Sequence, residues 1–422
     1  MRRRVVLVVV ALALLAIVGG AFAYYMARVN NQPEGALDTA LSGVSVETAT
    51  EATTTTEPTT TREAETGPPE ECWRFFGGNP ARSLGRPDIR IGKPTKVLWK
   101  RKFSGIMEYP PTFCDGRLYV NLLKGATFAL NARTGRILWR RVPGGTASSP
   151  AIYGSLLIVS SHDGSVTAYR RENGNKVWRV RTAGKVESSA VVVGDTAYFG
   201  STDGRVFAVD ADKGSVRWAY NTGGRINSSP SIWGDRLCIS TYAGSVFCLD
   251  RRNGRKLWST YVKRNFVSYE SFYASASTDG PRVYTTSRTG KVVAFSARSG
   301  RILWTHNMGS LAYSTPAIAN GRIFVGAFDG RLRCLRAGDG KLLWSIPIGG
   351  RMLAPAVVVG DIVFAATLDG NTVGLRATDG KILWRQSKGR YSPGIATDRH
   401  YYFSLGKTMF AYRGERSPPE VD

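Results

Sequence analysis

Residues with the chemistry for catalysis are few in this sequence and they are scattered. The histidines His162, His306 and His400 stand at unrelated positions and do not have the spacing of a metal site. We find no Gly-x-Ser-x-Gly elbow, phosphate-binding loop or Cys-x-x-Cys pair. The acidic residues that do recur each precede a glycine: Asp163, Asp203, Asp329 and Asp369. Their recurrence indicates turn geometry rather than catalytic carboxylates, so we do not expect an enzyme.

These acids recur because the whole chain repeats. A small residue is followed six positions later by glycine and four positions after that by tryptophan, as in Ala129, Gly135 and Trp139. The period is close to 40 residues, which is typical of a repeat fold. The tryptophans of this frame are Trp139, Trp178, Trp218, Trp258, Trp304, Trp344 and Trp384.

Each repeat is predicted to hold four short strands. In the third repeat we expect them over residues 188–193, 196–200, 205–209 and 216–220, separated by turns rich in glycine and aspartate. Four antiparallel strands per 40 residues are typical of a propeller blade. We therefore predict an all-β propeller over residues 72–414.

The number of blades follows from the two ends of the repeat region. An extra strand at 97–101, with Trp99, lacks the three strands that should precede it. Three strands near the end, at 392–396, 401–404 and 408–412, lack the tryptophan strand that should follow. Joined as one shared blade, these pieces complete an eight-bladed ring without an open edge.

Two loops are candidate binding sites. A basic residue follows glycine on the way into the innermost strand of four repeats, and a hydroxyl residue lies just inside; the positions are Lys185, Arg225, Arg351 and Arg390, with Ser149, Ser189, Ser229 and Thr315. Ring symmetry would gather these charges at one mouth of the channel, where they would attract an anion or acidic peptide. The alternative is that glycine followed by a basic residue is ordinary loop sequence.

The second candidate is an insertion in the fifth repeat, where Trp258 and Trp304 are 46 residues apart. The extra residues lie within 263–273, a loop with two basic residues and the aromatics Phe266, Tyr269, Phe272 and Tyr273. Such a loop suits contact with a peptide or polymer. Its aromatics could equally pack into the neighbouring blade.

The tryptophan spacing resembles the docking repeat of the pyrroloquinoline-quinone (PQQ)-like propellers over about residues 73–413. The segment 72–82, Cys-Trp-Arg-Phe-Phe-Gly-Gly-Asn-Pro-Ala-Arg, is similar to the lead-in of non-enzymatic outer-membrane assembly factors of this type. The resemblance implies that each indole is held between a small residue of its own blade and the glycine turn of the next. Removing one such buried tryptophan should cost roughly 3–5 kcal/mol.

The enzymes of that family bind PQQ and calcium and usually carry a vicinal cysteine ring. No Cys-Cys pair exists here, and the candidate calcium ligands Glu187, Asn227 and Glu270 fall in three consecutive repeats. We interpret each of these as a solvated loop residue. We therefore expect no cofactor, with PQQ and calcium as the alternative.

The formal net charge of +25 is unevenly distributed: residues 1–30 carry +4 and residues 31–71 carry −8, which leaves +29 on 72–422. A basic propeller is suited to a polyanionic partner, although a general excess of arginine over a solvated surface explains the charge equally well. We expect an envelope protein or an anionic polymer as the partner, and not nucleic acid.

Three arginines precede an apolar run at 5–27, which as a helix would span about 34 Å and cross a bilayer. We predict a short cytoplasmic tip at 1–4, a membrane signal-anchor at 5–27, a disordered linker rich in Thr, Glu and Pro at 28–71, and a tail at 415–422. The propeller would then lie outside the cytoplasm. Cleavage of a signal peptide near Ala23 is the alternative.

The five cysteines leave more than one pairing open. Cys238 and Cys248 flank a turn and could face each other across a hairpin. Cys248 also shares with Cys334 the small position beneath a docking tryptophan, and we favour simple packing of buried thiols there. A bridge between Cys72 and Cys114 is a further possibility.

Together these features predict a membrane-anchored, extracytoplasmic scaffold that binds a protein or polymer in the cell envelope. The resemblance leaves two alternatives. One is a PQQ-dependent dehydrogenase, and the other is the sensing ectodomain of a signalling system.

Overall fold

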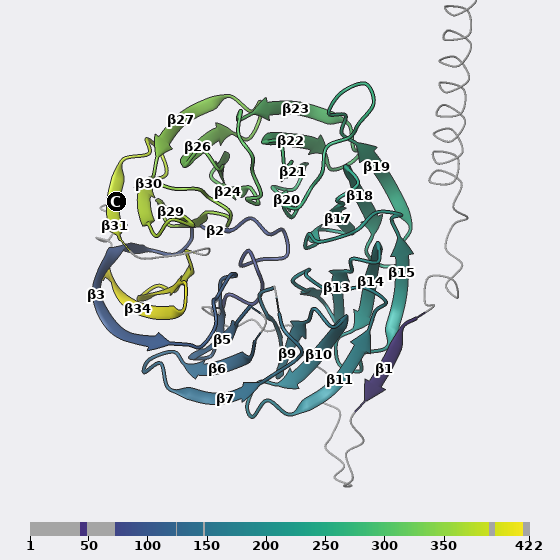
Figure 1. Cartoon of the computed structure of the whole chain (residues 1–422), viewed down its shortest axis with the longest axis horizontal. Coiled ribbons are helices and arrows are strands. Elements are labelled where there is room, and N and C mark those ends of the chain that lie inside the picture. Colours follow the sequence, from purple (N-terminus) through teal and green to yellow (C-terminus); the bar gives the residue numbers. More distant parts are fainter. Residues whose placement is uncertain (1–42, 49–71, 124, 147, 388–392, 417–422) are drawn as a thin grey trace, which may run out of the picture.

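Eight sheets stand around a common axis in this computed structural model (Figure 1). The structure describes residues 43–48, 72–123, 125–146, 148–387 and 393–416. Within a blade the chain forms an antiparallel meander from the axis outward, and it then returns to the axis in the next blade. The predicted all-β, eight-bladed propeller is confirmed.

Seven blades each use four consecutive strands, numbered from the axis outward. Blade 1 is β4 (Thr112–Cys114), β5 (Arg117–Asn121), β6 (Thr127–Asn131) and β7 (Ile137–Arg141). Blade 2 is β8 (Ala151–Tyr153), β9 (Leu156–Ser160), β10 (Ser165–Arg170) and β11 (Lys176–Arg181). Blade 3 is β12 (Val191–Val193), β13 (Thr196–Gly200), β14 (Arg205–Asp210) and β15 (Val216–Asn221). Blade 4 is β16 (Ser231–Trp233), β17 (Arg236–Ser240), β18 (Ser245–Asp250) and β19 (Lys256–Tyr261).

The remaining blades follow in the same order. Blade 5 is β20 (Ser277–Thr278), β21 (Arg282–Thr286), β22 (Lys291–Ser296) and β23 (Ile302–Asn307). Blade 6 is β24 (Ala317–Ala319), β25 (Arg322–Gly326), β26 (Arg331–Arg336) and β27 (Leu342–Pro347). Blade 7 is β28 (Val357–Val359), β29 (Ile362–Ala366), β30 (Thr372–Arg376) and β31 (Ile382–Gln386). Blade 8 is β32 (Ile395–Ala396), β33 (His400–Leu405), β34 (Thr408–Arg416) and β3 (Ile91–Lys102).

The ring closes through blade 8, where the first and last parts of the propeller pair. Strand β3 runs antiparallel to β34, with Trp99 opposite Ala411 and Lys102 opposite Thr408. This pairing confirms the predicted shared blade. It also satisfies the backbone groups of two strands that would otherwise be open edges.

Two short strands add to the blades from the segments before the ring. Strand β2 (Gly85–Arg86) runs parallel to β28 on the axial side of blade 7. Strand β1 (Ser45–Thr48) pairs antiparallel with β11 at the outer edge of blade 2 (Figure 1). The expectation of a disordered linker is therefore wrong for residues 45–48, because backbone pairing with an open edge needs no apolar side chains.

The predicted membrane helix at 5–27, the tip at 1–4 and the cleavage site near Ala23 lie outside the described residues. Within the part of the chain that the structure describes, no helix has the length and apolar character to cross a membrane.

Docked tryptophans join each blade to the next. Trp178 is fully buried, lies opposite Ala168 in its own blade, and donates a hydrogen bond from Nε1 to the Ala211 carbonyl of the next blade at 2.9 Å. The turn at Gly214 lies against its ring, so close that an added Cβ would meet the indole at 2.8 Å. The predicted sandwich is therefore confirmed. The same bond to the next blade is made by Trp99, Trp139, Trp218, Trp258, Trp304 and Trp344.

The contact between blades 7 and 8 differs from the others. Trp384 stacks on Phe403, with ring centroids 5.3 Å apart, and meets Tyr412 edge-on. Blade 8 places aromatic rings here, where the other blades place a glycine turn against the indole. Aromatic packing replaces the docking contact at the blade that closes the ring.

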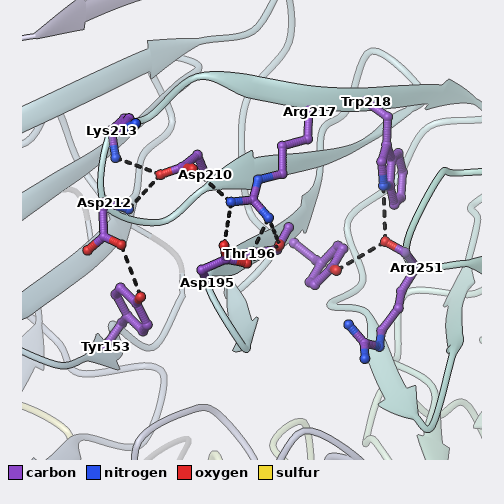
Figure 2. A network of polar contacts seen from close by, with 10 residues as sticks. Tyr153, Asp195, Thr196, Asp210, Asp212, Lys213, Arg217, Trp218 and Arg251 are labelled. Atoms are coloured by element: carbon purple, nitrogen blue, oxygen red, sulfur yellow. Dashed lines mark hydrogen bonds and ion pairs between the residues drawn. The ribbon is translucent and has the colours of Figure 1, made fainter. Parts of the chain in front are cut away.

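Polar contacts supplement docking on the outer strands. Figure 2 shows Arg217 between two carboxylates, with ion pairs of 2.7 Å to Asp195 and 2.7 Å to Asp210. These contacts, chiefly the hydrogen bond from Arg217, lower the pKa of Asp195 to about 2. Trp218 donates to the Arg251 carbonyl beside this cluster. The cluster is largely exposed, so its contribution to stability is modest.

Two disulfides are present, Cys72–Cys114 and Cys238–Cys248, and Cys334 is a buried free thiol. Cys248 and Cys334 do lie opposite Trp258 and Trp344 in the small position. The preference for packing of free thiols is nevertheless wrong for Cys248, which fills the small position as half of a cross-strand disulfide. Cys72–Cys114 fastens the lead-in segment to blade 1.

Candidate functional site

The axial channel is closed by the lead-in segment, residues 72–86, which crosses the centre of the ring (Figure 1). Trp73 exchanges two backbone hydrogen bonds with Phe113 of blade 1, and its Nε1 donates to the Ala396 carbonyl of blade 8. Further carbonyls of the segment accept from innermost strands: Arg74 from Ile152, Pro80 from Ile232, Ala81 from Thr278, Ser83 from Ile318, and Leu84 from Val358. The lead-in segment therefore closes the channel and is hydrogen-bonded to the blades around it. We call this segment the floor.

Arg82 holds the centre of this floor. Its guanidinium is completely buried and donates to three backbone carbonyls, those of Phe76, Ser189 and Pro230. Burial lowers the pKa of Arg82 to about 9, so the side chain is still a cation at neutral pH. Because Ser189 belongs to blade 3 and Pro230 to blade 4, Arg82 extends the contacts of the floor to all eight blades.

Above the floor, hydroxyl groups link the innermost segments of five neighbouring blades. The backbone N–H of Ser149 donates to the Ser189 hydroxyl at 3.0 Å, and Ser189 donates in the same way to Ser229 at 2.9 Å. The chain of bonds continues to Ser275 and Thr315. The predicted hydroxyl residues do gather around the axis, but they are buried. The oxygens of Ser189, Ser229 and Thr315 accept backbone N–H groups of the preceding blade, and the Ser149 hydroxyl donates to the Pro110 carbonyl. Their observed contacts are structural.

We call this chain of hydroxyl contacts, from Ser149 to Thr315, the belt. It also explains why the first strands are shorter than predicted. In blade 3 the expected strand begins at 188, whereas β12 begins at Val191. The backbone N–H of Ser189 is directed to a side chain of the neighbouring blade and does not join the ladder.

A small pocket remains between the floor and the mouth. Its lining includes Phe76 from the floor together with Glu108, Tyr109, Asn227 and Tyr273. The cavity volume is about 40 Å³, against roughly 300–1,000 Å³ for typical small-molecule sites. It has room for a few water molecules or one small group.

The titratable residues that line the pocket are one carboxylic acid and three tyrosines. Burial and the nearby charge of Glu187 raise the pKa of Glu108. Burial, followed by Glu187 and Glu108, raises the pKa of Tyr273 to about 12, and burial raises that of Tyr109 well above its usual range. The pocket therefore favours neutral forms of its own acids.

The candidate calcium ligands do not converge. Asn227 donates to Glu187 at 2.5 Å, so these two are neighbours in the channel. Glu270 is buried elsewhere, paired with Lys291 at 2.9 Å and accepting from Thr289. The interpretation as solvated loop residues is wrong for Asn227 and Glu270, because both side chains are buried in hydrogen-bonded positions. A three-residue calcium site does not fit this geometry.

Two of the predicted basic residues of the mouth are exposed but locally compensated. Arg225 lies 3.8 Å from Glu187 and over the ring of Tyr242. Arg351 pairs with Asp369 at 3.0 Å, and Lys185 is exposed on the neighbouring loop of blade 3. Arg390 lies outside the described residues. The mouth is thus a mixed surface of basic residues with acids just inside, which differs from the expected ring of like charges.

The insertion in blade 5 does not form a single aromatic surface. Phe266 is fully exposed, whereas Phe272 is fully buried. Tyr269 packs against Tyr261 with the ring centroids 5.1 Å apart and the rings tilted, and Tyr273 lines the axial pocket. Of the four predicted aromatics, Phe266 is the one presented freely to solvent.

Three of the recurring aspartates have the expected structural role. Asp163, Asp203 and Asp329 each accept a hydrogen bond from the backbone N–H two residues later in the turn. The histidines lie in blades 2, 5 and 8. Among the described residues the one group of possible metal ligands in close proximity is Cys72, Cys114 and Asp115, and both sulfurs are in a disulfide.

Sequence reasoning missed Glu108, Tyr109 and Ser275. The first two lie between Trp99 and blade 1, where no repeat had been established for comparison. Ser275 follows the insertion, which shifts its position relative to the other repeats. The sequence did hold a signal for the belt: Ser149, Ser229 and Thr315 are each followed by proline, and they mark the corresponding position in other blades.

The fold and its axial site define a PQQ-like, tryptophan-docked propeller. A family model described as outer membrane protein assembly factor BamB matches residues 86–268 and 263–398, and the chain belongs to this family. The outer membrane protein assembly factor BamB of Shewanella oneidensis (strain MR-1) is 34% identical over 68 residues, which cover 16% of this chain and 17% of that protein. The match thus spans about a sixth of the curated relative.

Solved structures share the fold at low identity. BamB from Moraxella catarrhalis has a TM-score of 0.55 at 18% identity, covering 79% of this chain and 96% of that one. A europium-containing methanol dehydrogenase has a TM-score of 0.69 at 14% identity, covering 79% and 90%. The computationally designed Ika8 protein has a TM-score of 0.62 at 14% identity, covering 76% and 100%. Such identities establish the architecture alone.

Proposed function

We propose that this chain is a non-catalytic scaffold of the cell envelope that holds a partner protein or polymer at the mouth of the propeller. The observation that carries the proposal is the closed channel. Phe76 and the rest of the lead-in segment lie across the axis, and the axial pocket above them has a volume of about 40 Å³. A quinone with a calcium ion needs a cavity several times larger, so PQQ does not fit this axial pocket.

Family and chemistry both support an assembly role outside the cytoplasm. The matched family is described as an outer membrane assembly factor. Two disulfides favour an oxidising compartment. The apolar run at 5–27 would tether the propeller to a membrane, with its mouth available to a partner.

Two measurements test the proposal. In the first, the full chain is titrated with PQQ and Ca²⁺ while tryptophan fluorescence is followed. We expect no saturable change. Saturable, calcium-dependent quenching at micromolar quinone would overturn the scaffold assignment and support the dehydrogenase.

In the second, a photo-crosslinking residue replaces Lys185 at the mouth in cells, with the same residue at Ser155 on the opposite face as control. We expect a discrete adduct from position 185 and none from 155. Equal labelling from both faces, or none from 185, would contradict binding at the mouth.

A further inference from the structure

Blade 5 projects a loop that the other full blades lack. In Figure 1 the chain that leaves β19 extends beyond the ring before it returns to β20. The base of this loop is well organised: Lys263 and Tyr269 form a β-bridge, and the Glu270 N–H donates to the Val262 carbonyl at 2.8 Å. The tilted ring contact between Tyr269 and Tyr261 adds side-chain support. The loop is therefore a built feature of the blade.

The tip of the loop is fixed by Asn265. Its Oδ1 accepts from the Val267 N–H at 3.1 Å, the Ser268 N–H at 2.8 Å and the Ser268 hydroxyl at 2.7 Å. Arg264 closes the turn by donating its N–H to the Ser268 carbonyl at 2.9 Å. This local network leaves Phe266 and Val267 at the apex, with their side chains directed away from the protein.

Both apical side chains are almost wholly in water. Phe266 is fully exposed and Val267 is 88% exposed. Exposing adjacent large apolar side chains on a fixed turn forgoes the free energy of burying them. An inserted, rigid, apolar apex is therefore suited to a contact made with something outside this chain.

The collar of the tip is basic. Lys263 and Arg264 are exposed, and neither side chain forms an ion pair with another of the described residues. The nearest carboxylate in sequence, Glu270, is buried and bound to Lys291 and Thr289. Glu270 therefore does not neutralise the two positive charges next to the apolar apex.

We propose that the 263–268 tip inserts Phe266 and Val267 into the headgroup region of an anionic lipid bilayer. An apolar apex with a basic collar matches the two components of interfacial binding, burial of apolar area and attraction to anionic lipids. The net charge of +29 on residues 72–422 adds a favourable long-range term. This contact goes beyond the scaffold function, because it orients the propeller on a membrane whatever occupies the mouth.

The experiment uses the full chain with an environment-sensitive fluorophore at the tip, through Phe266→Cys. The background carries Cys334→Ala, because alanine fills the equivalent docking position in other blades. The protein is mixed with vesicles of phosphatidylcholine alone or with about 30% phosphatidylglycerol. A matched control places the label at Ser155→Cys, an exposed turn position on the opposite face.

We expect the label at 266 to shift to the blue and to become protected from aqueous quencher only in the anionic vesicles. The label at 155 should stay in water in both. Adding Lys263→Gln and Arg264→Gln should lower the ratio of inserted to exposed tip by roughly 25-fold, from about fivefold per cation, and about 0.5 M salt should have a similar effect.

The local readout separates tip insertion from any association made by the rest of the chain. A label at 266 that stays aqueous in anionic vesicles, or that behaves like the label at 155, overturns the proposal. Equal insertion into neutral and anionic vesicles also overturns it. None of these outcomes bears on the quinone titration or the crosslinks at the mouth, so the two proposals fail separately.

Discussion

Replacing Arg82 with alanine should destabilise the propeller from its centre. The side chain is completely buried and its three hydrogen bonds end on carbonyls of Phe76, Ser189 and Pro230. These carbonyls belong to the floor, blade 3 and blade 4, so no single neighbouring group can replace the lost donor. Truncation to alanine leaves all three carbonyls without their hydrogen-bond donor, and it opens a cavity where the guanidinium was.

The size of the effect follows from these bonds. Three hydrogen bonds from a charged donor, at about 1.5 kcal/mol each, give roughly 4–5 kcal/mol. This lies near the ~3–5 kcal/mol expected on removing one partner of a buried charged interaction. Arg82→Lys should retain part of this free energy, because an ammonium carries three donors on a single atom and cannot span all three carbonyls.

The assay is urea unfolding followed by tryptophan fluorescence, with free energies compared at the same denaturant concentration. The control is Arg133→Ala, an exposed arginine in a turn of blade 1, which should change stability by at most ~0.5 kcal/mol. Loss of less than about 1 kcal/mol in Arg82→Ala would refute the view that the floor is held by this side chain. Similar losses in Arg82→Ala and Arg133→Ala would refute it as well.

Three further predictions concern docking, disulfides and the axial pocket. Gly214→Ala should cost about 1–3 kcal/mol more than Gly194→Ala in the same unfolding assay, because both glycines have positive φ but only the first touches an indole; equal losses would contradict docking at this turn. Cys114→Ser, which opens a bridge of sequence separation 42, should cost about 1 kcal/mol more than Cys238→Ser, whose bridge has a separation of 10; the reverse order would contradict it. Burial raises the pKa of Glu108 in the folded state. Protonation of Glu108 therefore favours the folded state at low pH, and this contribution to stability is lost as pH rises through the folded pKa. Glu108→Gln should therefore gain stability relative to wild type as pH rises above the usual carboxyl range, and a pH-independent difference would rule this out.

Much of the fold could be predicted because its determinants are local. Trp178, its small partner Ala168 and the glycine turns follow one another at fixed spacing, so the repeat, the strand order and the shared blade can be derived without a structure. The first strands were predicted too long. Side-chain bonds between blades, such as that from the N–H of Ser189 to Ser229, interrupt the ladder and leave no periodic trace in the apolar pattern.

The candidate site was predicted less well because it depends on contacts between distant residues. Arg225 and Arg351 were expected to form part of a ring of like charges, but each lies near a carboxylate that comes from another loop. Phe266 and Phe272 are six residues apart in one insertion, and only the packing of blade 5 decides that one is exposed and the other buried.

The repeat and the number of blades could be derived from the order of the amino acids, because the spacing within each repeat is fixed and the two incomplete repeats at the ends complete one blade. The docking of the tryptophans was expected from the family resemblance that this spacing carries. The lead-in motif that ends at Arg82 is equally visible there. That this motif closes the channel depends on the folded ring, because its hydrogen bonds reach blades as much as 323 residues away along the chain, as from Trp73 to Ala396. Ring closure brings all eight innermost strands within reach of one short segment, and no local sequence pattern encodes the contacts between them.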